Sequence, residues 1–383
     1  MKKVRLVFGV DISMDEFHVC AKTESVHGEV KIKGTHTFGN TAKGFDDFYC
    51  WVKKLASGGE SVFFVMEATG VYFEDLAYFL HEHGEHVSVV LPNKIKNFAK
   101  SLNVKTKTDK VDSKTIAQFG IERGQEKWFP LSPHYRELRD LCRELLSIKK
   151  DRVRAKNQLH AINHSFGKSS RIVKLKEEQI GFYEAKICEI EEAIMQLASE
   201  DPALMEKLAR LETIPGIKFL TAVMLASETN GFKLFQNIRQ LVSYAGLDVK
   251  FNDSGKFKGK ASITKKGNSR IRQVLYMPAL SAIQHNEPIK RLHERVCEKN
   301  PQVRQKGVVA GMRKLLIYTY IIWKKKEVYD KNYVWTPKTS GNDETKPSFG
   351  HLAEPKKRGK NCPALDRLRY KEPTEAFFWS EQR

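Results

Sequence analysis

Four acidic residues stand in contexts typical of a divalent-metal site. Asp11 follows an apolar run in Gly-Val-Asp11-Ile-Ser, Glu67 ends another in Val-Met-Glu67-Ala-Thr-Gly, and Asp109 and Asp112 share the segment Lys-Thr-Asp109-Lys-Val-Asp112. Carboxylates placed where strands end or a helix begins can converge on one Mg²⁺ ion. Each acid alone is more often a helix cap or a solvated charge. Together, in this order, they predict a hydrolase or a strand-transfer enzyme.

The first third of the chain must position these acids, and its pattern is that of an α/β domain. Short apolar or alternating runs at 4–12, 17–23, 29–38, 61–66 and 86–91 predict strands, and helical spacing at 40–59 and 71–83 predicts helices. Three strands followed by alternating helix and strand is the order of an RNase H-like fold. Asp11 then lies near the end of the first strand and Glu67 at the end of the fourth.

The last two acids are three residues apart. If the segment from Asp109 to about Gly120 is helical, Asp109 and Asp112 share one face, and Ile116 and Phe119 point toward the core. A clustered acidic face repels itself without a cation. The expected cofactor is therefore Mg²⁺, with Mn²⁺ as the alternative ion.

Composition narrows the class of partner. The 383 residues carry a formal charge of +20, with a pI near 9.5, which predicts a polyanionic partner and nucleic acid before a membrane surface. The apolar run 315–323 is too short to span a bilayer, and Arg5 and Asp11 interrupt any signal peptide. Six scattered cysteines suggest neither a zinc site nor disulfides. We expect a cytoplasmic protein with reduced thiols, associated with the nucleoid of a prokaryote.

Two apolar stripes of heptad type occupy the middle of the chain. One runs from Leu138 to Ile162 and the other from Ile180 to Leu197, with a likely turn at 167–170. They predict either an antiparallel helical hairpin or a dimerising coiled coil, and a plain spacer between domains is as compatible with the pattern as self-association.

The C-terminal part carries a candidate phosphate-binding turn and a basic segment. Ile214-Pro-Gly216-Ile-Lys218 resembles a helix-hairpin-helix turn, although Pro-Gly is also an ordinary helix connector. Between residues 250 and 272 the only acid is Asp253, and glycines are interspersed with the cations. Phosphate contact is the expected use. The candidate nucleic-acid ligands are Gly216, Lys218, Lys250, Lys256, Lys258, Lys260, Lys265, Lys266, Arg270 and Arg272.

Within this basic segment, Asn-Asp-Ser254-Gly places a serine in what we expect to be a mobile, cationic loop. Such a serine can attack phosphorus if a base or metal takes its proton and nearby cations stabilise the charge, whereas alone it would be a turn residue. After the loop, Ser269 is the expected cap of a helix bent by Pro278, and a last apolar helix covers about 308–323. Beyond Tyr329 the chain is polar and basic, as in a flexible tail.

The sequence divides into four expected regions. They are an α/β metal-binding domain at 1–130, a coiled-coil helical hairpin at 131–205, a mostly helical domain with the helix-hairpin-helix-like turn and the serine loop at 206–328 and a basic tail at 329–383.

Several motifs occur along the chain: Gly9-Val-Asp11-Ile, Glu67-Ala-Thr-Gly70, Lys107-Thr-Asp109-Lys-Val-Asp112, Ile214-Pro-Gly216, Tyr244-Ala-Gly-Leu247, Ser254-Gly255 with Gly259, and Lys265-Lys-Gly267 leading to Arg272 and Leu275-Tyr-Met-Pro-Ala279. Taken jointly, these motifs resemble the DEDD transposases of insertion-sequence family 110 over roughly residues 4–325. Ser113 follows Asp112 where the family usually has alanine, and the tail after Tyr329 does not align with the family.

The resemblance implies a RuvC-like domain in which Asp11, Glu67, Asp109 and Asp112 bind Mg²⁺. It also implies that Ser254 is the nucleophile and forms a covalent 5′-phosphoserine link with DNA. A dimer or tetramer would bring the acids of one protomer to the serine of another. A structured bridge RNA would specify the donor and target DNA.

Three hypotheses are compatible with these residues. The first is a transposase that cuts and rejoins DNA through the acids and Ser254. The second is a stand-alone RuvC-like junction-resolving nuclease that uses metal-activated water and forms no covalent intermediate. The third is a nucleic-acid-binding protein without catalysis, for which the four carboxylates would be dispensable.

Overall fold

The computed structural model describes residues 4–331 except 57, 107, 125, 252, 256 and 260. The predicted tail falls almost entirely outside the described residues, as do Lys256 and Lys260. Within the described chain, no helix is both long and apolar enough to cross a membrane.

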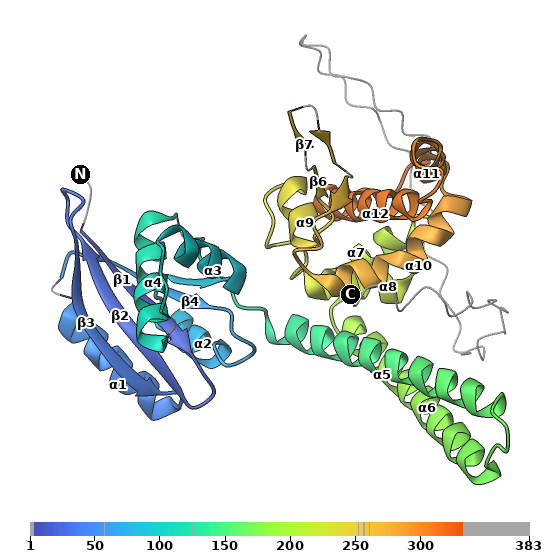
Figure 1. The fold of residues 1–383 in the computed structure, drawn as a ribbon, viewed down its shortest axis with the longest axis horizontal. Coiled ribbons are helices and arrows are strands. Elements are labelled where there is room, and N and C mark those ends of the chain that lie inside the picture. The colour runs from blue at the N-terminus through green and yellow to red at the C-terminus, as the bar shows by residue number, and fades with distance from the viewer. Residues whose placement is uncertain are drawn as a thin grey trace. The chain divides into compact units, whose positions relative to one another are not determined.

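The N-terminal part is a mixed five-stranded sheet with helices on both faces (Figure 1). Its strand order is β3-β2-β1-β4-β5, in which β1, β2 and β3 pair antiparallel and β4 and β5 run parallel to β1. The five predicted strands are confirmed, in the predicted order along the chain. Their bounds are β1 Arg5–Ile12, β2 Glu16–Glu24, β3 Val30–Gly39, β4 Ser61–Glu67 and β5 Val87–Val90.

One face of the sheet packs against α1 (Ala42–Leu55) and α2 (Glu74–Glu82). Phe48 of α1 is fully buried against Phe8 and Phe64, which extend from the centre of the sheet. Thr41 caps α1 by accepting a hydrogen bond from the Gly44 amide at 3.3 Å. Helix α2 begins at Glu74, three residues after the start of the helix predicted at 71–83.

The opposite face packs against α3 (Pro92–Ser101) and α4 (Asp109–Glu122). Val7 and Val65 of the central strands contact this second layer, which includes Ile95 of α3 and Ile116 of α4. The predicted helix at 109–120 is therefore present. The sequence did not predict α3, because Ile95 and Phe98 are its only fully buried apolar residues and a stripe of two is too weak a periodic signal.

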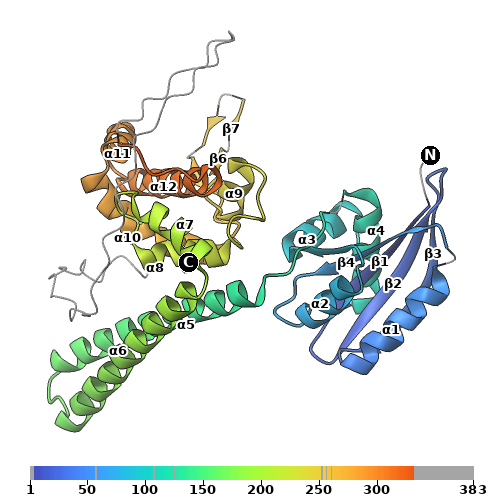
Figure 2. The same cartoon turned by 180° about the vertical axis from the view of Figure 1, so that it is seen from behind.

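Two long helices, α5 (Pro133–Asn163) and α6 (Ser170–Ser199), form an antiparallel hairpin, seen from behind in Figure 2. Cross-pairs fix the direction, because Lys149 binds Glu191 at 2.7 Å and Lys156 binds Glu184 at 3.1 Å. The hairpin alternative of the heptad prediction is thus present within one chain.

The remainder is mostly helical and shares a single core with the inner part of the hairpin. Asn268 caps α10 through hydrogen bonds from the Arg270 and Ile271 amides, so the prediction that Ser269 is the cap was wrong by one residue. The backbone of Asn268 is extended, as is typical of an N-cap residue whose side-chain oxygen accepts hydrogen bonds from the first helical amides. The helices are α7 Pro202–Glu212, α8 Phe219–Glu228, α9 Ile238–Tyr244, α10 Ser269–His285, α11 Glu287–Lys299 and α12 Gln305–Lys325.

The contact between α4 and β1 leaves no room for a side chain at Gly9. A Cβ there would lie 2.2 Å from the Ala117 amide nitrogen and 2.4 Å from the Ser113 carbonyl oxygen. We expect Gly9→Ala to lower the free energy of unfolding by about 1–3 kcal/mol, because backbone cannot move aside as a flexible side chain can. Thermal unfolding followed by circular dichroism measures the change.

Gly181→Ala in α6 is the matched control, since its added Cβ meets nothing within 4 Å. Alanine is also the better helix former, so this variant should be as stable as the parent or slightly more so. Equal destabilisation of both variants would contradict the close-packing argument.

Candidate functional site

Asp11 and Glu67 lie at the same edge of the sheet. Val10 of β1 is level with Met66 of β4, so the next residue on each parallel strand is one of the two acids. Side chains alternate across a strand, and Asp11 therefore shares the face of Val7 and Gly9, as Glu67 shares that of Val65. Both carboxylates are half-buried on the face covered by α4.

Helix α4 brings the other two acids to this edge. Ser113 and Ala117 lie over Gly9, whereas a Cβ on Gly120 would lie 2.6 Å from Val7, so the helix runs antiparallel to β1. Its first turn, with half-buried Asp112 and exposed Asp109, is consequently at the end where β1 and β4 finish. Four acids from three elements thus lie around one edge of the sheet.

The side chains do not form a closed ligand set. Among the residues that the structure describes, no three His, Cys, Asp or Glu side chains gather closely enough to hold one metal ion. Asp11, Glu67 and Asp112 each take part in other hydrogen-bonding or electrostatic interactions. The backbone therefore places the acids at one edge of the sheet.

Ser254 lies in a two-step β-ribbon, not in the irregular loop that the glycines suggested. The inner step pairs β6 (Val249–Lys250) with β9 (Ser262–Ile263), and the outer step pairs β7 (Asp253–Ser254) with β8 (Phe257–Lys258). Ser254 is exposed opposite Phe257, and Gly255 turns the chain with a φ of +54°. A φ of this sign favours glycine.

The base of this ribbon is held by two motifs that pack against each other. The Lys265 amide donates to the Gly246 carbonyl at 3.1 Å, and the Asn268 amide donates to the Tyr244 carbonyl at 2.6 Å. A Cβ on Gly267 would lie 2.3 Å from the same Tyr244 oxygen. The Tyr-Ala-Gly-Leu and Lys-Lys-Gly motifs therefore have a structural role, because they pack against each other at the base of the ribbon that carries Ser254.

The predicted nucleic-acid ligands differ in their surroundings. The Arg272 guanidinium donates to the Ala245 carbonyl at 2.9 Å, and a Cβ on Gly216 would lie 2.6 Å from the Pro278 carbonyl oxygen, so both residues have structural contacts. Lys258 belongs to β8. The cations exposed to solvent are Lys218, Lys250, Lys265, Lys266 and Arg270.

A buried ion pair below the ribbon was not predicted from the sequence. The Arg143 guanidinium of α5 donates two hydrogen bonds, of 2.7 and 3.0 Å, to the carboxylate of Glu228 at the end of α8. Asn268 donates a third at 2.7 Å, and the Glu228 side chain is only 4% exposed. Burial alone would raise the pKa of Glu228, but the hydrogen bonds and charge of Arg143 hold that pKa below its ordinary value.

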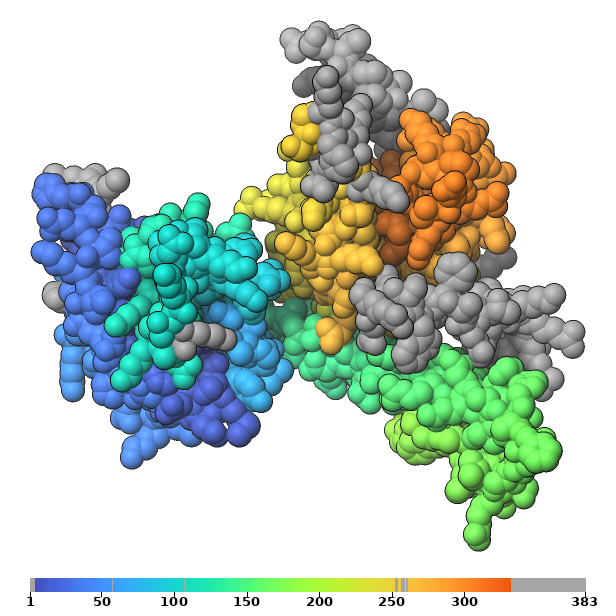
Figure 3. Space-filling view, in the orientation of Figure 1, coloured from blue at the N-terminus to red at the C-terminus, as the bar shows by residue number. Residues whose placement is uncertain are grey.

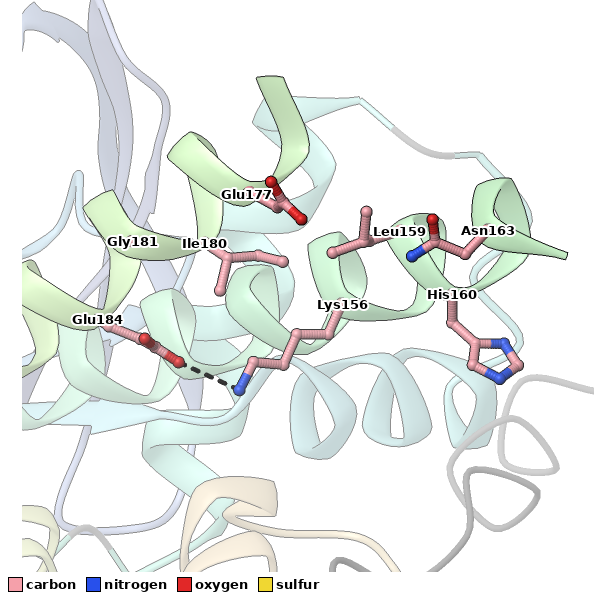
Figure 4. A pocket seen from close by; sticks show the side chains of 8 residues that line it. All are labelled: Lys156, Leu159, His160, Asn163, Glu177, Ile180, Gly181 and Glu184. Carbon is pink, nitrogen blue, oxygen red and sulfur yellow. Dashed lines mark ion pairs between the residues drawn. The ribbon is translucent and has the colours of Figure 1, made fainter. Parts of the chain in front are cut away.

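A surface hollow between α5 and α6 contains none of the predicted site residues (Figure 4). The ion pair between Lys156 and Glu184 crosses it, as the dashed line shows. Its lining residues are Lys156, Leu159, His160, Asn163, Glu177, Ile180, Gly181 and Glu184.

Comparison with known proteins assigns two matches along the chain. A family model for the DEDD transposase domain of the IS110 group matches residues 8–163, and the model described as "Transposase IS116/IS110/IS902 family" matches residues 208–294. The "Pilin gene-inverting protein" of Moraxella lacunata is 28% identical over 324 residues, covering 84% of this chain and 97% of that protein. The "Transposase for insertion sequence element IS1328" of Yersinia enterocolitica is 24% identical, covering 75% and 86% respectively.

The Arg143–Glu228 pair predicts a pH-dependent contribution to stability. Glu228→Gln keeps an acceptor for Asn268 but removes the charge, and we expect it to cost about 1.5–3 kcal/mol at neutral pH. The Glu228 pKa is lowered in the folded state, so the stabilisation is complete well above pH 4.5 and disappears as the pH falls through the folded pKa. The melting-temperature gap between parent and variant should therefore narrow as the pH is lowered below 4.5.

Glu287→Gln is the matched control for this measurement. Glu287 accepts a 2.8 Å hydrogen bond from Arg291, but both side chains are more than half exposed, so solvent screens the pair. Its loss should change stability by less than about 1 kcal/mol. A Glu228→Gln protein as stable as this control would show that the buried pair contributes nothing.

Proposed function

Because this chain belongs to the IS110 family of transposases and is an enzyme that acts on DNA, we propose that it mobilises an insertion sequence by cutting and rejoining strands. The observation that carries the proposal is the placement of Asp11, Glu67 and the acidic first turn of α4 around one edge of the sheet. The strand order β3-β2-β1-β4-β5 supports an RNase H-like, RuvC-like fold for the region 1–130.

Asp11, Glu67, Asp109 and Asp112 would hold the metal ion, with Mg²⁺ preferred and Mn²⁺ as the alternative. The donor set fits, because hard divalent cations take carboxylate oxygens and these four come from two strand ends and one helix turn. A bound ion would neutralise charge on the phosphate as it reacts. The sheet and α4 fix the backbone positions of the acids, so the ligands would be held at one edge of the sheet.

Ser254 would act as the nucleophile. Its Oγ forms a bond to phosphorus while the bond from phosphorus to the 3′ oxygen breaks, which leaves a 5′-phosphoserine and a free 3′-hydroxyl. The hydroxyl proton of the serine ends on the departing 3′ oxygen, and the reverse attack by a new 3′-hydroxyl rejoins the DNA. Exposure of Ser254 on a ribbon flanked by Lys250 and Lys265 supports access to a phosphate.

A complete site would combine two copies of the chain. We propose a homodimer or homotetramer in which the acids of one protomer meet Ser254 of another, with the coiled-coil hairpin at 131–205 as the connector and 206–328 as the serine-bearing domain. A noncoding bridge RNA would select donor and target DNA. The Moraxella relative is named for inverting a pilin gene, which supports conservative rejoining of strands in place of simple cleavage.

Replacing the serine tests the covalent step. Ser254→Ala should abolish the protein–DNA adduct that survives denaturing electrophoresis with end-labelled DNA, because no other group would form the bond. Ser262→Ala, an exposed serine on the inner step of the same ribbon, is the control and should form the adduct normally. An adduct from Ser254→Ala would exclude this serine as the nucleophile, whereas no adduct from the parent protein would favour a RuvC-like junction-resolving nuclease that uses water.

Replacing one carboxylate tests the metal site. Asp11→Asn should reduce strand cleavage by at least about 10²-fold, as expected for losing a group that supports transition-state charge, while DNA binding is retained. Asp46→Asn, an exposed acid of α1 on the other face of the sheet, should cleave at the parental rate. Cleavage assays with Mg²⁺, with Mn²⁺ and with a chelator distinguish the outcomes, and chelator-resistant cleavage would exclude the proposed cofactor.

A further inference from the structure

The segment between Glu85 and Asp109 has an unusual charge composition. Its residues 86–108 include five lysines and no aspartate or glutamate. Many charged surface segments carry both signs, so a run of this length with one sign is a candidate contact for a polyanion. The expected nucleic-acid ligands at 216–218 and 250–272 do not include any of these residues.

Topology places this segment beside the acidic edge at both ends. It begins at β5, where the Ala68 amide, next to Glu67, donates to the Val90 carbonyl at 2.9 Å. It ends at Thr108, which caps α4 just before Asp109 and Asp112. Helix α3 lies between these ends and packs beside α4, and Figure 3 shows both helices on one face of the protein.

The outer face of α3 carries side chains that can donate hydrogen bonds and no acid. Ile95 and Phe98 are buried at 4% and 6% exposure, Ile95 in the core over the sheet and Phe98 against Phe119 of α4, and they mark the inner face of the helix. On the opposite side, all four residues at positions i, i+3, i+4 and i+7 are exposed. These residues are Asn93, Lys96, Asn97 and Lys100.

The lysines of this face are not neutralised by an ion pair in the described part of the chain. No such pair involves Lys96 or Lys100, although other exposed lysines such as Lys31 and Lys186 do form ion pairs. Helix α3 itself contains no acid. An exposed helix face with two lysines and two amides matches the groups that commonly contact phosphate oxygens.

We propose that the outer face of α3 binds phosphates of DNA, along the DNA strand that leads away from the acidic edge of the sheet. Its position relative to cleavage rests on the proposed metal site, but the contact with DNA does not depend on chemistry there. Phosphate contacts position a duplex without reading its sequence. The face would thus hold DNA in register with Asp11 and Glu67 whichever sequence is recombined.

Salt dependence of binding tests this contact. The full-length Lys96→Ala/Lys100→Ala protein should bind duplex DNA of arbitrary sequence about tenfold more weakly near 0.15 M salt. The slope of log affinity against log salt should fall by about 2, because each lysine–phosphate contact contributes roughly 0.9. Fluorescence anisotropy in the presence of a chelator makes the measurement without cleavage. Lys96→Arg/Lys100→Arg should keep the parental slope.

Lys43→Ala/Lys54→Ala is the matched control, because these exposed lysines lie on α1, which covers the other face of the sheet. It removes the same charge and should leave the slope unchanged within about 0.5. An equal fall in both double variants, no fall in either, or a fall with duplex RNA but not with DNA would overturn the proposal. A failed Ser254 adduct test leaves this experiment intact, so the two proposals can fail separately.

Discussion

The backbone contact between α4 and β1 is the constraint on which the acidic edge depends. Gly9 lets the helix approach until Ser113 and Ala117 touch the strand, and Gly120 repeats the close approach at Val7, two residues back along β1. Together, the two close approaches fix the direction of α4 and its position along β1. That geometry, not any contact among the carboxylates, determines that the first turn of α4 meets the ends of β1 and β4.

The serine is held by a different kind of structure. Short ladders of two residues per strand support Ser254, and the rigid part lies beneath, where Asn268 connects the Tyr244 carbonyl, the cap of α10 and the buried Glu228 carboxylate. Two-stranded ribbons of this length have little stability of their own. This combination of rigidly placed acids and a serine on a short ribbon suits the proposed site, in which Ser254 of one protomer would reach the acids of another.

Sequence periodicity predicted the five strands in their order along the chain, together with α1 and the hairpin, because β1 and β4 are continuous buried runs and these helices have long apolar stripes. It missed α3, whose stripe has two buried residues. It also missed Arg143 and Glu228, which are 85 residues apart, since nothing local signals a partner at that distance. Arg272 looked like a DNA ligand because charge is visible in a sequence and a contact with the Ala245 carbonyl is not.

The glycine and the aspartate of the first motif fail in different ways as copies of a mobile gene decay. A change at Asp11 removes an oxygen ligand from the edge but leaves the sheet packed, so the cell would still contain a folded protein that occupies DNA ends and blocks active copies. A change at Gly9 pushes α4 against the backbone of β1 and lowers the free energy of unfolding, so a larger fraction of the protein is unfolded and open to proteolysis. Two residues apart, the same kind of accident thus leaves either a folded inhibitor of the element or a smaller amount of less stable protein.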